Sequence, residues 1–286
     1  MRAFSPPTGP DHDLGSAAMS DDPATQPVEP RAAATVLLVR DEPAGGDLQV
    51  FLQRRVAGMA FAGGMTVFPG GGVSAGDEPD PGRWRGPDPA LFGARLAQPA
   101  VLAAALVTAA VRETFEECGV LLAAPTGSDP GPLEAAAAWR DDLVAHRTTL
   151  PELLAAHDLE LRADLLVPWA RWITPPRNPK RYDTAFLVAR VPDGQVADDA
   201  TTEAVEARWW TPAEALAGYD DGDLKLMPPT LRTLQELDRH ATAADVLAAA
   251  AERDIEPITP EVRREGRVVT ITLPGDPDWI YEEALR

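Results

Sequence analysis

The sequence predicts an α+β protein in which a mixed β-sheet is sandwiched between helices. Three observations predict this fold class. Strand-length runs of β-branched, leucine and aromatic residues are interspersed with alanine- and leucine-rich stretches of helix length. These segments do not follow the strict βαβ alternation that indicates a doubly wound parallel sheet. The length of 286 residues, 45% of them hydrophobic, suits one large domain or one domain with appendages.

The composition divides the chain into three regions. Residues 1–30 are rich in proline and show no apolar periodicity, so we expect a disordered N-terminal segment. Residues 31–254 carry the strand and helix patterns of the main domain. Residues 255–286 hold one strand candidate at 267–273, and we interpret them as a C-terminal extension.

The first strands lead to a glycine-rich segment. Residues 33–40 and 48–54 have strand-like composition, and the loop at 41–47 between them predicts a hairpin. A third short strand at 65–68 runs into Pro69 and three glycines, residues 69–72. Glycines allow a tight turn here and let a ligand approach the backbone closely.

A long helix follows a loop-like excursion. Residues 78–99 are rich in proline, glycine and aspartate, which is typical of a loop. The stretch from about Pro99 to Cys118 predicts a helix, because proline suits a first turn and alanine is a strong helix former. Further helices are expected near residues 132–146 and 150–157.

The second half of the main domain is predicted to contain three strands and three helices. The strands are at 165–173, 182–191 and 205–210, a helix starts at 211–214, and two more helices cover 228–240 and 242–252. The helix start carries a threonine N-cap, a proline and a capping-box glutamate in order.

Charge and cysteine content exclude several functions. The formal net charge of -19 and the pI near 4.5 argue against nucleic-acid or membrane-surface binding. No uncharged apolar run reaches about 18 residues, so we expect no transmembrane span. A single cysteine, Cys118, excludes intramolecular disulfides and fits a reducing compartment, so we expect a cytoplasmic protein.

The stretch Arg112–Val120 carries three glutamates close together. At about 100° per residue on a helix, Glu113, Glu116 and Glu117 form one charged face. Like charges at these spacings repel, and a divalent cation with oxygen ligands offsets that repulsion. Gly119 suits the left-handed residue that ends a helix.

This stretch resembles the second half of the Nudix box, whose pattern is R-E-U-x-E-E-x-G-U with U apolar. The segment from Phe68 to Asp77, which contains Gly70 and Gly71, resembles the first half of the same box. Residues 78–111 separate the halves where about seven residues are expected, so the box contains an insertion, which we assign to residues 78–104. Asp77 replaces a glutamate of the pattern, and Thr114 stands at a usually apolar position.

The resemblance implies a Nudix-type α/β/α sandwich around the mixed sheet and a site for Mg²⁺ or Mn²⁺. It implies Glu116 and Glu117 as direct ligands, Glu113 as a ligand or base, and the Gly71 carbonyl as a further ligand. Arg112 is expected to pair with Asp77 or a neighbouring glutamate. The implied catalytic set is Arg112, Glu113, Glu116 and Glu117, supported by Gly70, Gly71, Asp77 and Gly119.

The long insertion and several outer motifs resemble the Nudix branch similar to the mammalian peroxisomal coenzyme A diphosphatase. These motifs are Thr174-Pro175, residues 181–186 and residues 228–231. The branch implies coenzyme A or acyl-coenzyme A as substrate. ADP-ribose, NADH or a dinucleotide are the alternatives. A ligand-sensing or binding module without turnover is a further alternative, which predicts loss of a box glutamate, whereas all three are present.

Basic and acidic residues outside the box are candidates for substrate binding. Strand alternation puts only one of Arg54 and Arg55 on the site side, and Arg54 is the candidate. Arg177 and Arg181 belong to the densest basic cluster and suit phosphate contacts, although a solvated loop is an equal alternative. Glu203 is a candidate to complete the site, against the alternative of an exposed charge. The insertion could be a lid, a specificity loop or the contact of a homodimer.

Overall fold

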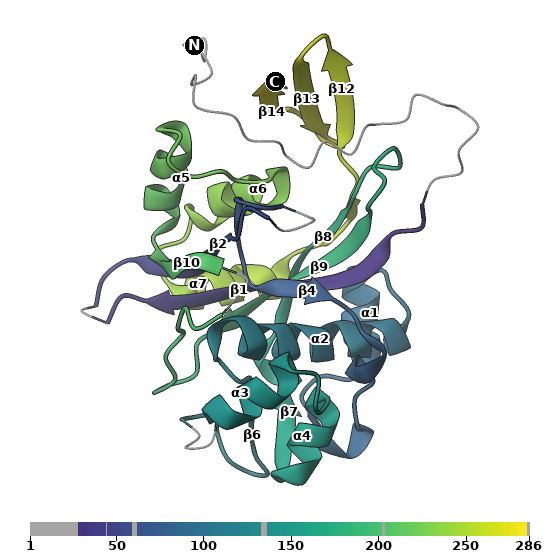
Figure 1. Cartoon of the computed structure of the whole chain (residues 1–286), viewed down its shortest axis with the longest axis vertical. Helices are drawn as coiled ribbons and strands as arrows, with labels where there is room; N and C mark the ends of the chain where they lie inside the picture. The colour runs from purple at the N-terminus through teal and green to yellow at the C-terminus, as the bar shows by residue number, and fades with distance from the viewer. Residues whose placement is uncertain (1–27, 44, 59–61, 133–135, 202–203, 285–286) are drawn as a thin grey trace.

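The computed structural model describes residues 28–43, 45–58, 62–132, 136–201 and 204–284, and its centre is an eight-stranded mixed sheet (Figure 1). The strand order is β10-β2-β1-β9-β8-β11, with β3 paired to β2 and β4 paired to β1. The strands are β1 (Arg31–Asp41), β2 (Leu48–Arg55), β3 (Thr66–Val67), β4 (Gly70–Gly72), β8 (Val167–Ile173), β9 (Tyr182–Arg190), β10 (Ala204–Trp210) and β11 (Pro257–Ile258). The predicted disorder of residues 1–30 falls mostly on residues outside the described ranges.

The central strand β1 shows why the sheet is covered on both faces. It runs antiparallel to β2 and parallel to β9, and most of its side chains are buried. Ala34, Val36 and Leu38 belong to one hydrophobic core, whereas Leu37 and Val39 belong to another. Alternate residues of a strand point to opposite faces, so the sheet has a separate core on each side.

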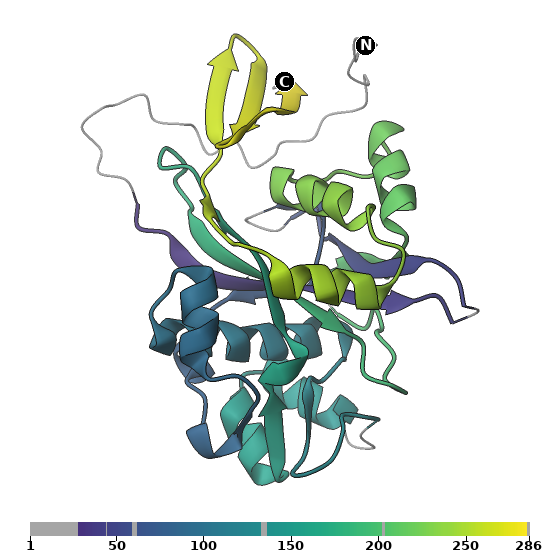
Figure 2. The ribbon, with the colours of Figure 1, turned by 180° about the vertical axis from the view of Figure 1, so that it is seen from behind.

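Helices cover both faces of this sheet (Figures 1 and 2). The helices are α1 (Pro89–Leu96), α2 (Ala100–Cys118), α3 (Ala136–Val144), α4 (Leu150–Ala156), α5 (Pro212–Asp220), α6 (Pro228–Leu237) and α7 (Ala243–Glu252). Helices α1 and α2 pack into the first core, and α5, α6 and α7 pack into the second. The predicted α+β sandwich around a mixed sheet is therefore confirmed.

Helix α2 has the predicted start and end. Pro99 is its N-cap residue, and Gly119 ends it in the left-handed conformation with φ 73°. The Gly119 N–H donates to the Phe115 carbonyl, which closes the last turn. Among the described residues no single helix is long and apolar enough to cross a membrane, and only the α1–α2 pair, bent by 97°, has the required length and composition.

The glycine segment forms a strand instead of the expected tight turn. Gly70–Gly72 pair antiparallel with β1, so that Gly71 lies opposite Ala34. A Cβ atom on Gly70 would collide with the Ala34 carbonyl oxygen. Glycine is needed at position 70 because two backbones approach closely there, which a sequence pattern cannot distinguish from a turn.

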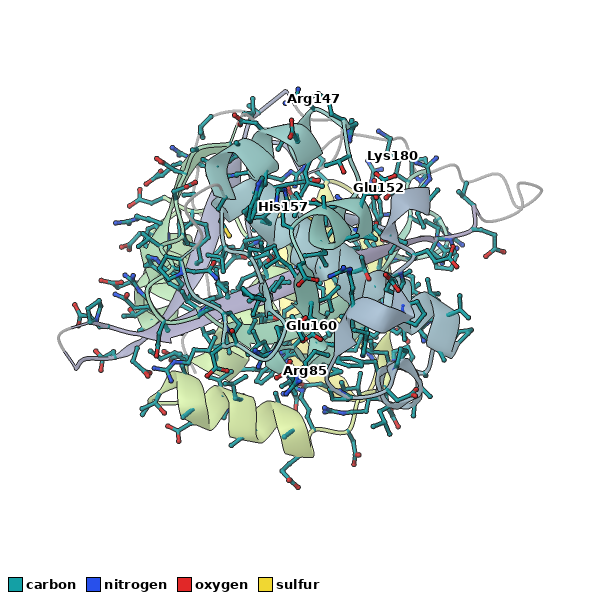
Figure 3. All side chains as sticks on the ribbon, turned by 90° about the horizontal axis from the view of Figure 1, so that it is seen from below. Arg85, Arg147, Glu152, His157, Glu160 and Lys180 are labelled. Atoms are coloured by element: carbon teal, nitrogen blue, oxygen red, sulfur yellow. The ribbon has the colours of Figure 1, made fainter. Side chains whose placement is uncertain are left out.

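The excursion at 78–99 contains structure that the loop prediction missed. It holds α1, which starts at Asp88, an N-cap residue whose side chain accepts from the Ala90 N–H. A small second sheet combines β5 (Trp84–Arg85), β7 (Leu159–Arg162) and β6 (Ala123–Pro125). Strands of two to four residues are too short to show periodicity. Figure 3 views this side of the molecule, where the side chains of Arg85, His157 and Glu160 lie.

The C-terminal extension is a three-stranded antiparallel sheet where only one strand was predicted. Its strands are β12 (Glu261–Glu265), β13 (Val268–Leu273) and β14 (Asp276–Ala284). Charged residues on the outer face of β12 and β14 hid the strand pattern, since each strand has few apolar residues. We refer to these three strands as the C-terminal sheet.

Candidate active site

The last two turns of α2 place three glutamates beside β4. The Glu117 side chain is buried, with 4% of the residue exposed. The side chains of Glu113 and Glu116 are each 14% exposed. A Cβ atom on Gly71 would collide with the Glu113 carboxylate, so this carboxylate lies directly against the β4 backbone.

Arg112 joins the two halves of the motif across the insertion. Its guanidinium donates to both carboxylate oxygens of Asp77, at 2.7 and 3.0 Å. It also donates to Glu113 at 2.8 Å, to Glu116 at 3.2 Å and to the Gly72 carbonyl at 3.0 Å. Asp77 is fully buried. The predicted Arg112–Asp77 pair is present, and the shorter aspartate side chain reaches it because the insertion loops out and returns.

Glu117 is held by groups other than Arg112. One of its oxygens accepts from the Gly70 N–H at 2.8 Å and from the Gln53 amide at 2.5 Å. Gln53 is buried on β2, and its Oε1 atom has no hydrogen-bond partner among the described residues. The sequence analysis did not identify Gln53. The sequence feature that could have identified Gln53 is its polar side chain in a strand whose other residues near it are apolar or arginine.

Burial controls the protonation of the three glutamates. Loss of solvation and, to a smaller extent, the nearby Glu113 charge raise the pKa of Glu117 to about 8, against the opposing effects of Gly70, Arg55 and Gln53. Burial also raises the pKa of Glu113 to about 7, against the opposing effect of Arg112. The pKa of Glu116 is raised for the same reason. Three neighbouring glutamates whose pKa values are raised thus form a site that favours an added positive charge.

The donor set suits a hard divalent cation. Three carboxylates supply the oxygen ligands that such cations prefer, and the backbone of Gly71, whose carbonyl is the predicted further ligand, lies against the Glu113 carboxylate. Within the part of the chain that the structure describes, no three His, Cys, Asp or Glu side chains are arranged so that they could hold a metal ion together. In this arrangement Arg112 binds Glu113 and Glu116, while Gln53 and Gly70 bind Glu117.

A cavity of about 390 Å³ adjoins β4. Ala33 and Thr35 line it, and these residues alternate along β1 with the residues that face α2. The cavity therefore lies on the other face of the sheet. Its described lining is mostly apolar and consists of Ala33, Thr35, Arg55, Ala62, Val67, Phe68, Gly70, Gly71, Gly72, Trp172, Ile173, Thr174, Pro175, Asn178, Tyr182, Thr184, Phe186, Met227, Pro228, Pro229, Thr230, Pro260, Val262 and Ile271.

Arg55, and not Arg54, is linked both to the cavity and to the glutamates. Arg55 lines the cavity, and its charge lowers the pKa of Glu117. Arg54 forms an exposed ion pair with Glu206 at 3.1 Å and is absent from the described cavity lining. Strand alternation correctly limited the choice to one of the two arginines, but the structure favours Arg55.

The other predicted substrate residues are not gathered at the cavity. Arg181 donates to the carbonyls of Thr174 and Val28, at 3.0 and 2.7 Å. Arg177 is exposed, although Asn178 of the same loop lines the cavity. Glu203 lies outside the described residues.

Arg140 is a second residue that sequence analysis missed. It lies on α3, and its guanidinium donates to the Glu116 carbonyl at 2.9 Å and to Asp198 at 2.6 Å. The Asp198 N–H in turn donates to the Cys118 carbonyl. A cation here neutralises the negative end of α2, just where the glutamates lie. No local pattern marks this arginine, because its partners are far away in sequence.

Comparison with known proteins decides the family. The family model described as NUDT19 Nudix domain matches residues 79–237, which is more than half of the chain. The chain belongs to the Nudix family. The match starts just after Asp77, so the first half of the Nudix box precedes it, joined to the second half through Arg112.

Relatives and a solved structure agree with this family. A Xenopus laevis protein named acyl-coenzyme A diphosphatase NUDT19 is 25% identical over 276 residues, covering 80% of this chain and 71% of that protein. The human protein of the same name is 28% identical, covering 58% of this chain and 48% of that protein, so the match spans about half of the human relative. A NUDIX hydrolase crystal structure from Alicyclobacillus acidocaldarius is 27% identical, with a TM-score of 0.63, covering 77% of this chain and 96% of that one.

These similarities confirm that this protein is a Nudix hydrolase that resembles the NUDT19 group. The Nudix box is complete in its arginine and three glutamates, and the structure brings both halves together. The roles of individual residues in catalysis and metal binding stay predictions.

Proposed function

We propose that this Nudix hydrolase is a diphosphatase that uses Mg²⁺ or Mn²⁺ to cleave the diphosphate linkage of coenzyme A or an acyl-coenzyme A. The relatives named acyl-coenzyme A diphosphatase support the substrate class. The single observation that carries the proposal is the complete glutamate set held against β4, whose glycines also line the cavity. In this proposal the diphosphate binds at β4, and one arm of the substrate occupies the cavity.

Hydrolysis requires water to attack one phosphorus while the other phosphate leaves. A divalent cation, when held by Glu113, Glu116, Glu117 and the Gly71 carbonyl, would supply charge neutralisation of the phosphate oxygens and a more acidic water. If Glu113 is the base and not a ligand, its pKa, which burial raises to about 7, lets its carboxylate accept the proton of the attacking water at neutral pH. Arg112 keeps Glu113 and Glu116 in place through its anchor on Asp77.

Arg55 has a different role in this proposal. It lies where the cavity approaches Glu117, and it is positioned to bind a substrate phosphate. The complete glutamate set argues against a binding module without turnover. ADP-ribose, NADH and dinucleotides remain alternative substrates, and a homodimer and a cytoplasmic location remain predictions.

A substrate panel tests the proposal. The purified full chain is incubated with Mg²⁺ or Mn²⁺ and with coenzyme A, acetyl-coenzyme A, ADP-ribose, NADH or diadenosine polyphosphate, and the products are identified by mass spectrometry. We expect the coenzyme A compounds to have the highest kcat/KM and to yield adenosine 3′,5′-bisphosphate and a phosphopantetheine. Chelation with EDTA is the control and should abolish turnover.

Two outcomes would contradict the proposal in different ways. Faster cleavage of ADP-ribose or NADH would reassign the substrate within the same chemistry. No turnover with any compound, together with a ligand-induced rise in Tm, would indicate a binding module.

A further inference from the structure

The inner face of the C-terminal sheet carries a cluster of apolar side chains, with Arg264 and Glu283 farther along the same face. Val262 of β12 lies directly opposite Ile271 of β13, and Ile271 lies opposite Tyr281 of β14. Directly opposite residues in paired strands share a face of the sheet. Val268 and Ile280, by alternation, belong to the outer face, where they are 40% and 56% exposed.

Part of this inner face anchors the C-terminal sheet to the main domain. Leu273, Trp279 and Tyr281 are buried in the second core with α6. The Trp279 indole donates to Gln235 at 2.7 Å, and the Tyr281 hydroxyl donates to the Leu226 carbonyl at 3.2 Å. The C-terminal sheet is therefore fixed in position, and not a loosely attached tail.

The rest of the inner face lines the substrate cavity. Val262 and Ile271, with Pro260, lie on its wall and are only partly buried. The main sheet contributes Gly70–Gly72 and Arg55 to the same cavity. Figure 1 shows the C-terminal sheet on the α6 side of the main sheet, so the two sheets face the cavity from different directions.

The chemistry of this wall selects its ligand. Valine, isoleucine and proline side chains have no hydrogen-bonding groups, so they cannot recognise the edge of a base or the hydroxyls of a sugar. They are matched to a hydrocarbon chain, whose transfer from water to an apolar wall is favourable. The phosphates of the substrate are assigned to other groups that line the cavity, the β4 glycines and Arg55.

We propose that the C-terminal sheet is the wall that binds the acyl chain, so that Val262 and Ile271 make the enzyme select acyl-coenzyme A over free coenzyme A. This inference rests on the proposed function. The wall belongs to a segment beyond residue 237, where the Nudix family match ends, so the selectivity is a property of this chain's extension.

The test compares two double variants with the same residue changes on opposite faces. Val262→Thr with Ile271→Thr places a hydroxyl on both inner-face side chains and shortens the side chain at position 271 by one methyl group. Val268→Thr with Ile280→Thr is the matched control on the outer face. For each full-length protein, kcat/KM is measured with free coenzyme A, acetyl-coenzyme A and octanoyl-coenzyme A, and Tm is measured beside it.

For the inner-face variant we expect the ratio of octanoyl- to free coenzyme A kcat/KM to fall about tenfold, as lost methyl contacts predict. The control should keep the wild-type ratio. Val262→Phe provides a second test that keeps the wall apolar: by narrowing the cavity it should also lower the octanoyl rate selectively. An unchanged ratio in both inner-face proteins would overturn the proposal.

Other results separate the two proposals. An equal loss with all three substrates would show that the wall contacts the part they share, which overturns the acyl assignment but leaves the diphosphatase function intact. A wild-type protein that cleaves none of the three compounds would overturn the proposed function, and this inference with it, before any variant is compared.

Discussion

At the scale of single residues, the three glutamates are held in two different ways. Glu113 and Glu116 share the Arg112 guanidinium, whereas Glu117 is held by a backbone N–H and the Gln53 amide. Neutral donors do less than a cation to stabilise a buried carboxylate. Burial and the Glu113 charge raise the pKa of Glu117 to about 8, above the value of about 7 for Glu113, whose charge Arg112 offsets.

The first prediction concerns Glu117→Gln. We expect kcat to fall by about 10³-fold or more, because an amide cannot supply the negative charge that binds a divalent cation. The Tm without metal should not fall, since the wild-type carboxyl is buried and costly to ionise. Glu252→Gln, an exposed glutamate at the end of α7, is the matched control. Near-normal kcat in Glu117→Gln would refute the metal-site assignment.

A second prediction follows from the raised pKa values. Glu113 and Glu117 have pKa values near 7 and 8 in the folded protein and about 4.5 when unfolded. The folded state therefore binds more protons between these values, and stability falls as the pH rises from about 4.5 to about 8. In EDTA we expect the free energy of unfolding in urea to drop by a few kcal/mol across this range.

Two comparisons check this pH dependence. Glu117→Gln should flatten the profile, since it removes the group with the larger shift. Added Mg²⁺ should stabilise the wild-type protein more at pH 8 than at pH 6, because metal ligands must be deprotonated. A stability in EDTA that rises with pH over this window would contradict the assigned pKa shifts.

At the scale of elements, α2 is the part of the fold that the sequence predicts best. Proline before it, alanine within it and Gly119 after it are local signals, and each acts through the backbone of the same helix. Strands β1, β2, β8 and β9 were also predicted, because each is long enough to show a pattern. The glutamates could be found for the same reason, since they lie on one helix.

Elements and residues defined by distant partners could not be predicted in this way. Strands β6 and β7 pair with each other although helices α3 and α4 separate them in the sequence. Gln53 and Arg140 matter only because folding brings them to Glu117 and to the end of α2. The choice of Arg55 over Arg54 depends likewise on where the end of β2 lies relative to the cavity.

The third prediction concerns the end of α2. Arg140→Met removes a buried guanidinium that binds the Glu116 carbonyl and Asp198. We expect a loss of about 2–4 kcal/mol in unfolding free energy, because the helix end and Asp198 both lose their partner. Activity should fall mainly through kcat, since the glutamates shift with the helix end. Arg147→Met, an exposed arginine just beyond α3, is the control and should change stability by less than about 0.5 kcal/mol.

At the scale of the whole molecule, the main sheet separates the glutamates of α2 from the cavity. Helix α2 and its glutamates lie on one face, and the cavity lies on the other, between the main sheet and the C-terminal sheet. Strand β4 belongs to both, because its glycines line the cavity while Gly70 binds Glu117. A side chain at Gly70 would collide with the β1 backbone and one at Gly71 with the Glu113 carboxylate, so glycine is required at these two positions for the structure as well as for the site.

The last prediction separates the structural and selective roles of the C-terminal sheet. Removing residues 255–286 deletes Leu273, Trp279 and Tyr281 and exposes the apolar side of α6 that they cover. Burial of three large side chains contributes roughly 4–8 kcal/mol, so the truncated chain should melt at a clearly lower temperature and associate on size-exclusion chromatography. The inner-face double variant keeps these anchors and should retain nearly the wild-type Tm. A truncated chain that stays monomeric with an unchanged Tm would show that the C-terminal sheet does not stabilise the domain, and any loss of acyl selectivity would then report on the wall alone.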